Sequence, residues 1–502
     1  MVPNTRLIGI DIGTTHCKAG LFATDGAALR IARRPTPTRR AQEGYAYYDP
    51  EELWLAVASA LREVTVGQGP RAKVVAVGVA SMGEAGLLVD GTTGAPLSHF
   101  VPWYDPCTMS QGDLLRRAGD PLERFRVTGW RAGFKCSLAK ILWLRERRGS
   151  LPANARWLSM AGYIAYRLTG AMAVDYSLAN RTFAFDLARK EWDTAWLRWL
   201  GLDPAIFPPA VPSGTPVGRT TGTLAGLPAG TPVAVSGHDH ICASLAAGVT
   251  RPGRIFDSMG TAEAILGVTQ QRPLGESEFR SGFAFGCHAV PGMLYWLGGL
   301  SASGGSVEWL RGIVGGRPLS YRQVQALLAQ AGEAPTGILY FPYLAGRSSP
   351  HSDGAQRGAF VGLRASHRRA DLLKAVLEGT AYEIESIRRE ARSATGEEAG
   401  EMVVAGGGAR LERWLQIKAD VAGCRLALRD LPEATLLGAA LAAGVGAGLW
   451  RDAQSALDGL RQKGVRSVEP DPGRHETYRR LYEQGFEPVG RSLGDYYRRE
   501  QM

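Results

Sequence analysis

The feature of this 502-residue chain that most constrains its fold is an opening that occurs twice. Near the N-terminus an apolar stretch ends at Asp11 and runs into the turn Gly13-Thr14. The segment RIFDSMGTAEAILGVT (254–269) has the same plan: an apolar start, an aspartate, a Gly-Thr turn and a second apolar stretch. Such a recurrence indicates internal duplication. We therefore expect two related lobes, and a chain of this length also exceeds what one hydrophobic core usually supports.

The first half of the chain is expected to form a layered α/β lobe. From residue 7, LIGIDIGTTHCKAGLFATDGAALRIARR predicts three strands joined by a turn and an Asp-Gly hairpin. Asp49, with Pro50 in the first turn and Glu52 three positions later, predicts the start of a helix. The run VVAVGVA (74–80) is typical of a strand buried on both faces. Strands and helices thus alternate, and TRPG near residue 250 is the expected boundary between the lobes.

Composition excludes several classes of protein. The six cysteines are scattered without a CxxC pair, which argues against a disulfide framework or zinc knuckle and favours the cytoplasm. The start MVPNTRLIGIDIG lacks the regions of a signal peptide, so we do not expect export. The net charge of +10 is spread along the chain without a nucleic-acid module, so we expect no nucleic-acid partner but a basic surface that attracts anionic metabolites.

The most membrane-like segment is ATLLGAALAAGVGAGLW (434–450). As a helix it would span only about 25 Å at ~1.5 Å per residue, which is short of a hydrocarbon core of ~30 Å. Its glycine and alanine content suits close packing inside a protein. We therefore predict a buried helix and no membrane span.

Glycine turns are the candidate phosphate-binding elements of the chain. Neither GxxxxGK[ST] nor GxGxxG occurs, so a P-loop or dinucleotide fold is not expected. The chain has instead two Gly-Thr turns and the triplet Gly406-Gly407-Gly408. Glycine turns bring backbone N–H groups close to phosphate oxygens, and two facing turns could hold a triphosphate from both sides. Each turn taken alone could also be an ordinary structural hairpin. The occurrence of both turns and the glycine triplet, in this order along one chain, favours phosphate binding.

Long sequence blocks in a fixed order resemble the FGGY carbohydrate kinases. The resemblance implies an α/β fold of two actin-like, ribonuclease H-like lobes around a central nucleotide and sugar cleft. It also implies ATP and Mg²⁺ as cofactors, a sugar-binding lobe at 1–249 and a nucleotide-binding lobe at 250–502. The blocks that carry it are DIGTTHCKAG, WYDP, AGYIAYRLTG, DYSLANRTFAFD, GHDHICASLAAG, SMGTAE, GILYFPYLAGRSSP, RGAFVGLRASHRRADLLKAVLEGTAYE, VVAGGGARLERWLQIKADVAG and EATLLGAALAAG.

The family pattern assigns expected roles to individual residues. Asp11 would help to hold Mg²⁺ through water, near Asp239, which matches the catalytic base. The two Gly-Thr turns would hold the phosphates of ATP, and a third region would hold its adenosine. The nucleotide residues implied in this way are Gly13, Thr14, Thr15 and Lys18 in the first turn, Gly260, Thr261 and Gly304 around the second, and Gly406, Gly407 and Arg410 beside the adenine and ribose.

The sequence around Asp239 supports a catalytic carboxylate independently of the resemblance. The apolar run at 233–235 predicts a strand that ends at Gly237 and leads into a helix. Asp239 would therefore lie at the carboxyl edge of a sheet, where ligands of α/β proteins bind, and could accept the proton of a substrate hydroxyl.

A metal site with both flanking histidines is the alternative reading of Asp239. In an extended segment the rings of His238 and His240 would lie opposite the aspartate, so a three-ligand site would need a kinked backbone. We expect the histidines to contact sugar hydroxyls or to support Asp239.

Sugar contacts are expected at two further positions. The loop Ser81-Met82-Gly83-Glu84-Ala85 departs from the Gln-Met-His or Arg-Glu of typical family members. Glu84 falls on the polyol-binding position, with a solvated loop carboxylate as the alternative. Trp103 and Asp105 in VPWYDP match the family's aromatic wall and carboxylate, with a structural turn around a core tryptophan as the alternative.

The predicted function is an ATP- and Mg²⁺-dependent kinase of a small ketose, deoxyketose or polyol, of xylulose or fuculose type. A non-catalytic sugar or nucleotide sensor on the same fold is the alternative, and a homodimer is left open. A chaperone-like ATPase would need a separate peptide-binding domain, for which the chain after residue 450 is too short.

Overall fold

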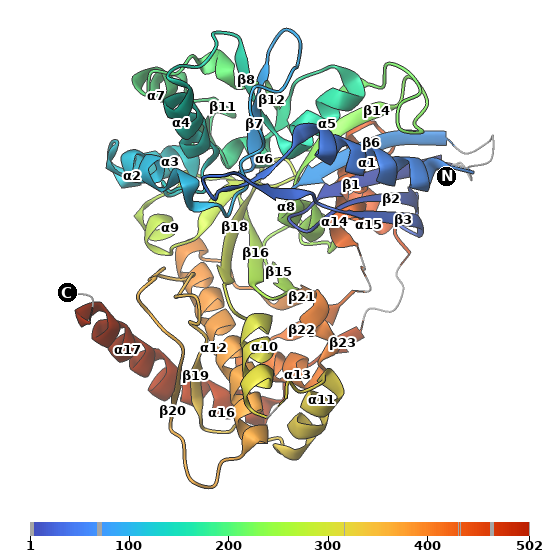
Figure 1. Cartoon of the computed structure of the whole chain (residues 1–502). Coiled ribbons are helices and arrows are strands. Elements are labelled where there is room, and N and C mark those ends of the chain that lie inside the picture. Colours follow the sequence, from blue (N-terminus) through green and yellow to red (C-terminus); the bar gives the residue numbers. More distant parts are fainter. Residues whose placement is uncertain are drawn as a thin grey trace.

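The structure of the protein, a computed structural model, describes residues 5–67, 73–315, 317–429, 431, 433–461 and 466–500. The N-terminal and C-terminal halves form two lobes, drawn above and below one another in Figure 1. Each lobe contains its own large sheet with helices against it. The α/β class predicted from the sequence is confirmed.

The sheet of the N-terminal lobe contains the three strands predicted from residue 7. They are antiparallel neighbours, and the first of them also pairs in parallel with the predicted buried strand. The strand order is β13-β14-β6-β1-β2-β3. The bounds are β1 Thr5–Ile12, β2 His16–Ala23, β3 Ala28–Pro35, β6 Lys73–Ser81, β13 Pro216–Arg219 and β14 Pro232–His238.

The sheet of the C-terminal lobe repeats this topology. Its first strand, β15, is antiparallel to β16 and parallel to β21, which is parallel to β22. β16 is antiparallel to β18, so three antiparallel strands followed by two parallel ones recur in both lobes. The predicted duplication is therefore confirmed. The order is β17-β18-β16-β15-β21-β22-β23, and the bounds are β15 Arg254–Met259, β16 Glu263–Gln270, β17 Ala284–Cys287, β18 Met293–Leu300, β21 Glu401–Ala405, β22 Arg425–Leu428 and β23 Arg466–Val468.

Helices cover both sheets, and the predicted start of the first helix is confirmed. The Asp49 carboxylate accepts hydrogen bonds from the backbone N–H groups of Glu51 and Glu52, and Pro50 is the first helical residue. The helices are α1 Pro50–Thr65, α2 Met109–Arg117, α3 Pro121–Thr128, α4 Ser137–Arg148, α5 Met160–Thr169, α6 Tyr176–Asn180, α7 Thr194–Trp199, α8 Asp239–Ala246, α9 Glu276–Arg280, α10 Gly304–Ile313, α11 Tyr321–Gln330, α12 Arg369–Thr395, α13 Glu412–Ala422, α14 Ala434–Gly446, α15 Ala453–Asp458, α16 Pro472–Leu481 and α17 Glu487–Arg499.

Short strands form small two-stranded sheets outside the two lobes' central sheets. They are β4 Thr38–Arg40, β5 Ala46–Tyr48, β7 Gly86–Asp90, β8 Ala155–Ser159, β9 Val174–Asp175, β10 Phe185–Asp186, β11 Glu191–Trp192, β12 Ala210–Val211, β19 Leu339–Phe341 and β20 Ala359–Val361. Single helical turns lie at Pro106–Thr108, Pro204–Ile206 and Gly407–Arg410, and a π-helical turn at Tyr482–Phe486.

Helices α8 and α14 pack against each other between the two sheets. Ile241 of α8 lies in one apolar cluster with Phe256 of the C-terminal sheet. Helix α14, although late in the sequence, packs on β1 and β6 of the N-terminal sheet. Gly78 permits this approach, because a Cβ there would lie 2.0 Å from the carbonyl oxygen of Ala439. The predicted buried helix is confirmed, and no helix in the described ranges is long and apolar enough to cross a bilayer.

Candidate active site

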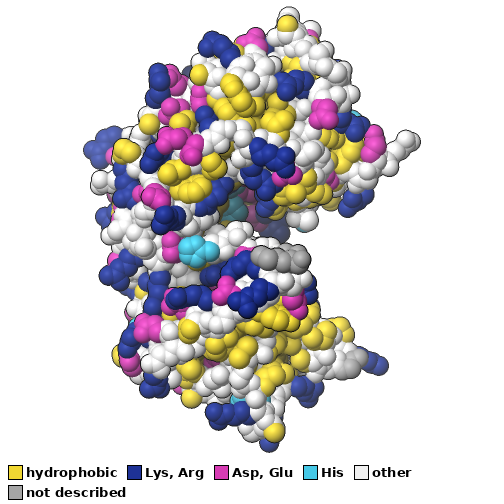
Figure 2. Space-filling model, turned by 90° about the vertical axis from the view of Figure 1, so that its left-hand side faces the viewer, with side chains coloured by type: hydrophobic (Ala, Val, Ile, Leu, Met, Phe, Trp, Pro, Cys, Tyr) yellow, Lys and Arg dark blue, Asp and Glu magenta, His cyan; other side chains and the backbone are white. Residues whose placement is uncertain are grey.

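Three parallel strands of the N-terminal sheet end at a common edge. The register places Ile12 of β1 beside Ser81 of β6, and Ser81 beside His238 of β14. Asp11, the loop after Ser81 and Asp239 therefore lie at one edge, as the sequence predicted for Asp239. The molecule is deeply hollowed between its two lobes (Figure 2).

The first predicted phosphate turn has a fixed backbone and exposed hydroxyls. The Gly13 N–H donates to the His16 carbonyl at 3.0 Å, and the Thr36 hydroxyl donates to the Gly13 carbonyl at 2.7 Å. The side chains of Thr14 and Thr15 are exposed. This turn can therefore present both hydroxyls to a ligand without rearranging its backbone.

Lys18 is held by a carboxylate that the sequence did not indicate. Its Nζ donates to Glu433 Oε2 at 3.0 Å, and Arg33 pairs with the other oxygen of Glu433. Glu433 directly precedes α14, so this contact joins the first turn's strand to the C-terminal half of the chain. Lys18 remains a predicted phosphate contact.

The second predicted turn meets two other glycine segments at the end of β15. The N–H groups of Gly304 and Gly305 donate to the carbonyls of Gly260 and Thr261, at 3.1 and 2.9 Å. Gly406 adopts φ +104°, and a Cβ there would lie 2.4 Å from the Met259 carbonyl oxygen. The structure thus brings the predicted second turn, Gly304 and the glycine triplet together, with Thr261, Gly407 and Arg410 exposed.

A buried ion cluster supports this second turn from below. Lys418 Nζ donates to Asp257 Oδ2 at 2.6 Å and also to Glu263, whose other oxygen accepts from the Ser303 hydroxyl. Burial, and then the neighbouring Glu263, raise the pKa of Asp257 well above its usual range. Because Asp257 and Glu263 flank the turn on β15 and β16, Lys418 of α13 fixes both of its ends.

Asp239 is the first residue of α8, and this corrects the extended geometry expected for the two histidines. Because the helix begins at Asp239, His238 Nε2 lies 3.1 Å from Asp239 Oδ1 rather than on the opposite side. The His240 backbone N–H donates to the same oxygen at 2.7 Å. No group of three His, Cys, Asp or Glu side chains in the described part of the chain is arranged to hold a metal ion.

A buried chain of polar contacts leads to Asp239. Arg181 Nη1 donates to Glu84 Oε1 at 2.9 Å, and Arg181 Nη2 lies 3.1 Å from both ring nitrogens of His238. The Arg181 guanidinium also lies 4.5 Å from the centre of the Trp130 ring. Sequence reasoning assigned no role to Arg181, although it lies within the block DYSLANRTFAFD.

The ring of His238 lies between Arg181 and Asp239. Burial, and then Arg181, lower the pKa of His238 well below its usual range, so its ring is neutral and carries one proton. Arginine can only donate hydrogen bonds. Arg181 Nη2 can therefore donate only to the ring nitrogen that carries no proton. The Nε2 atom lies 3.1 Å from Asp239 Oδ1, so the ring restricts the position of the carboxylate.

The predicted sugar residues have different environments. Glu84 is buried, has φ +55° and is paired with Arg181, which excludes the solvated loop carboxylate. The indole Nε1–H of Trp103 donates to the Thr14 hydroxyl at 3.2 Å, and Lys135 Nζ lies 5.0 Å from the ring centre. Trp103 thus forms a wall beside the first turn.

Asp105 requires a correction. One of its oxygens accepts from the Ala46 N–H at 2.6 Å and the other from the Cys107 N–H at 2.9 Å, and the residue is 5% exposed. The carboxylate caps the helical turn Pro106–Thr108 and ties it to β5. We therefore assign Asp105 a structural role in place of the expected sugar contact.

The surroundings of Asp11 fit a hard divalent cation. Asp11 Oδ1 is buried without a hydrogen-bond partner. Burial, and then the neighbouring Asp239 carboxylate, raise the pKa of Asp11 to about 7. Magnesium ions prefer carboxylate and other oxygen ligands. Asp11 and Asp239 therefore offer a site whose unfavourable charges such a cation would neutralise.

Two duplicated α/β lobes, facing a shared hollow and carrying glycine turns and edge carboxylates, define an actin-like phosphotransferase. The chain belongs to the FGGY family of carbohydrate kinases: the family's N-terminal domain matches residues 6–246 and its C-terminal domain residues 257–447. The predicted family, fold and enzyme class are thereby confirmed, and the sensor alternative has no support.

Relatives of this chain include kinases that are named for different substrates. It is 29% identical to a glycerol kinase of Gloeobacter violaceus over 92% of this chain and 93% of that protein. It is 28% identical to a xylulose kinase of Bacillus subtilis over 90% of each chain. The crystal structure of a gluconate kinase from Lactobacillus acidophilus shares the fold, with a TM-score of 0.90, 21% identity and 99% coverage of both chains.

Proposed function

We propose that this ATP-dependent carbohydrate kinase transfers the γ-phosphate of ATP to a hydroxyl of a small ketose or polyol, with Asp239 as the general base. The observation that carries the proposal is the position of Asp239. It lies at the edge shared with Asp11, next to the first glycine turn, and His238 orients it. A positioned carboxylate there can accept the proton of a bound alcohol while a phosphoryl group is transferred to its oxygen.

Asp11 and Asp239 are the residues that we propose to hold Mg²⁺. When bound, the cation would neutralise charge on the phosphate oxygens and lower the repulsion between the two carboxylates. The two Gly-Thr turns supply backbone N–H groups and hydroxyls to the phosphates. Trp103 provides an apolar wall next to Thr14, so a sugar packed on it would lie beside the phosphate-binding turn.

The proposed substrate class follows from the polar residues near Asp239 and from the relatives. Glu84 and Arg181 are paired with each other, which leaves a neutral pair beside His238 and favours an uncharged polyhydroxylated substrate over an acidic one. Glycerol and xylulose kinases are among the similar proteins. The test is ADP release with pentuloses, deoxyhexuloses, polyols and aldonates. Turnover with aldonates alone would contradict the proposed class.

Lys418→Met is expected to destabilise the protein and weaken ATP use. The variant leaves Asp257 and Glu263 buried without their cation, which costs roughly 3–5 kcal/mol of unfolding free energy. Loosening of the second turn should raise the KM for ATP about threefold to tenfold, the equivalent of one hydrogen bond. Urea unfolding and steady-state kinetics measure both effects.

Lys374→Met is the matched control for this variant. Lys374 is also a fully buried lysine of the C-terminal lobe, paired with Glu378 on α12 and with backbone carbonyls at 332–334. It should lose stability without a change in the KM for ATP. Equal KM values for ATP in the two variants would show that Lys418 does not support the second Gly-Thr turn.

His238→Gln is expected to lower kcat roughly fivefold, because the contact of its ring with the base is comparable to one hydrogen bond of about 1 kcal/mol. His240→Gln is the comparison, since His240 donates to the Asp239 carboxylate through its backbone N–H, which the substitution retains. The His240→Gln variant should change the KM for the sugar and leave kcat nearly unchanged. Since His238 stays neutral, the wild-type pH profile of kcat should show no limb from this residue near pH 6.5. An unchanged kcat in His238→Gln would rule out the positioning role.

A further inference from the structure

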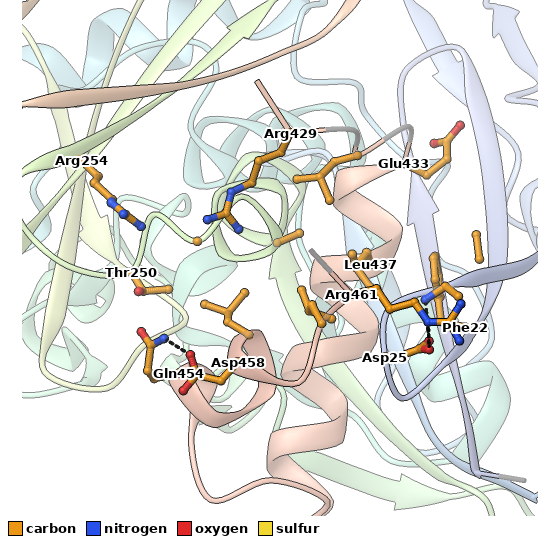
Figure 3. Close-up of a pocket in the computed structure, with 18 of the residues that line it drawn as sticks. Phe22, Asp25, Thr250, Arg254, Arg429, Glu433, Leu437, Gln454, Asp458 and Arg461 are labelled. Atoms are coloured by element: carbon orange, nitrogen blue, oxygen red, sulfur yellow. Dashed lines mark hydrogen bonds and ion pairs between the residues drawn. The ribbon is translucent and has the colours of Figure 1, made fainter. Parts of the chain in front are cut away.

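A cavity of about 520 Å³ lies at the junction of the two lobes, apart from the glycine turns. Figure 3 shows its walls. One wall is the β2–β3 hairpin of the N-terminal lobe, with Phe22 and Ile31. The others are the connection at 246–254 and residues between 429 and 461 of the C-terminal half. Both lobes therefore contribute to the cavity.

The carboxylates of this cavity already have partners. Asp25 pairs with Arg461 at 2.5 Å, and Asp458 accepts from the Gln454 amide at 2.7 Å (Figure 3). Glu433 pairs with Lys18 and Arg33, outside the cavity. Asp25 and Glu433 are therefore matched by cations of their own, whereas Asp458 keeps its negative charge.

Three further arginines line the cavity, and the carboxylate of Glu401 lies near two of them, Arg254 and Arg429. Arg254 Nε is 3.8 Å from Glu401, at the limit of an ion pair. Arg429 Nε is buried without a hydrogen-bond partner, and its guanidinium lies against the backbone of Gly248. Arg251 is exposed at the rim. With Arg461, the described lining of the cavity has four arginines and three carboxylates, a small excess of positive charge.

Arg254 and Arg429 extend into the same space, towards Thr250, from opposite sides (Figure 3). Burial, and then Arg254, lower the pKa of Arg429. Two guanidinium groups that face each other in a partly desolvated cavity repel, and an anion between them relieves this repulsion. Arginine also binds phosphate through paired N–H donors better than lysine does.

The rest of the wall is apolar. Phe22, Ile31, Leu437, Leu457 and Leu460 line the side away from the two arginines. An inorganic anion would leave this surface uncovered, whereas an organic phosphate would cover both parts of the cavity. A cavity of this size accommodates a small metabolite.

We propose that this interlobe cavity binds a small organic phosphate as an effector, with its phosphate between Arg254 and Arg429 and its carbon skeleton on the Phe22–Leu437 wall. Because both lobes form the cavity, an occupant contacts parts that move relative to each other when the lobes close. Its binding is therefore linked to turnover. This site is additional to the proposed catalytic function.

Calorimetric titration with phenyl phosphate tests the binding site. The full chain is used with Mg²⁺ and saturating ADP, so that the catalytic phosphate positions are occupied. We expect binding to wild type and at least roughly tenfold weaker binding to Arg429→Met. Binding to the control Arg322→Met should be unchanged, because Arg322 is an exposed residue of α11 that does not line the cavity. Phenol and inorganic phosphate should each bind more weakly than phenyl phosphate.

Arg251→Met provides a second variant at an exposed position, where truncation does not disturb the core, and it should also weaken binding. Saturating phenyl phosphate should change the kcat/KM of the wild type and not that of Arg429→Met. Absence of binding to wild type, binding to both arginine variants that is as tight as to wild type, or tighter binding of benzoate would overturn the phosphate site. Binding without any change in turnover would overturn the effector role.

Discussion

Asp239→Asn is expected to lower kcat by roughly 10²- to 10⁴-fold, the usual contribution of a positioned general base. An amide at this position keeps the size of the side chain but cannot accept the hydroxyl proton. The hydrogen bond from the His240 N–H to an oxygen of residue 239 can persist, so α8 should start at the same place. Steady-state ADP release with the preferred sugar, together with calorimetric titration of nucleotide, measures the effect.

Asp113→Asn is the control for the Asp239 variant. Asp113 is an exposed carboxylate on α2, paired with Arg116 of the same helix. It should retain wild-type kcat. Near-normal turnover of Asp239→Asn would show that another group accepts the proton, whereas loss of nucleotide binding would show that Asp239 acts mainly through the metal.

Asp11→Asn is expected to inactivate the enzyme and to stabilise the ligand-free protein. Removal of one proposed Mg²⁺ ligand should lower kcat/KM by at least about 100-fold, which corresponds to roughly 3 kcal/mol of transition-state stabilisation. The stabilisation follows from the unpartnered Oδ1 and from the charge of Asp239, which make an ionised Asp11 unfavourable in the folded state.

The pH dependence of this stability has a defined sign. The pKa of Asp11 is raised from 3.8 to about 7, so between these values the folded protein holds a proton that the unfolded chain releases. Stability therefore falls as pH rises through this window, and the whole penalty is present above pH 7. At about 1.4 kcal/mol per pH unit over this interval, it amounts to roughly 4 kcal/mol.

Urea unfolding of wild type and Asp11→Asn at pH 4 and pH 8 separates these effects. The variant should be more stable at pH 8 and nearly equal to wild type at pH 4, where Asp11 is protonated in the folded state and only about half ionised in the unfolded chain. Added Mg²⁺ should stabilise wild type at pH 8 and leave the variant unchanged. If Asp11→Asn is less stable than wild type at pH 8, the ionised Asp11 carboxylate does not destabilise the folded protein.

Local patterns in the sequence predicted the parts of the fold that depend on local structure. The recurring aspartate and Gly-Thr turn indicated the duplication because each copy is one strand-turn-strand unit. The apolar run at 233–235 placed Asp239 at a sheet edge because a parallel strand that leads into a helix must end there. Helix α14 was predicted to be buried from its composition, but not on the N-terminal sheet.

The contacts that were missed join residues distant in sequence. Lys418 meets Asp257 and Glu263 only because its side chain reaches from α13 to β15 and β16 in the folded chain, and no periodic pattern indicates such a contact. Arg181 and Glu433 likewise have partners on other elements. The error at His238 arose because the strand ends one residue before Asp239, a boundary that sequence patterns define poorly.

The distance between a bound sugar hydroxyl and the Asp239 carboxylate tests the proposed chemistry most directly. It can be measured in a crystal structure of the complex with Mg²⁺, a non-hydrolysable ATP analogue and the preferred sugar. We expect one hydroxyl oxygen within about 2.6–3.2 Å of an Asp239 oxygen and in line with the terminal phosphate. A reacting hydroxyl that contacts a different side chain, with Asp239 bound to protein groups alone, would contradict its role as the base.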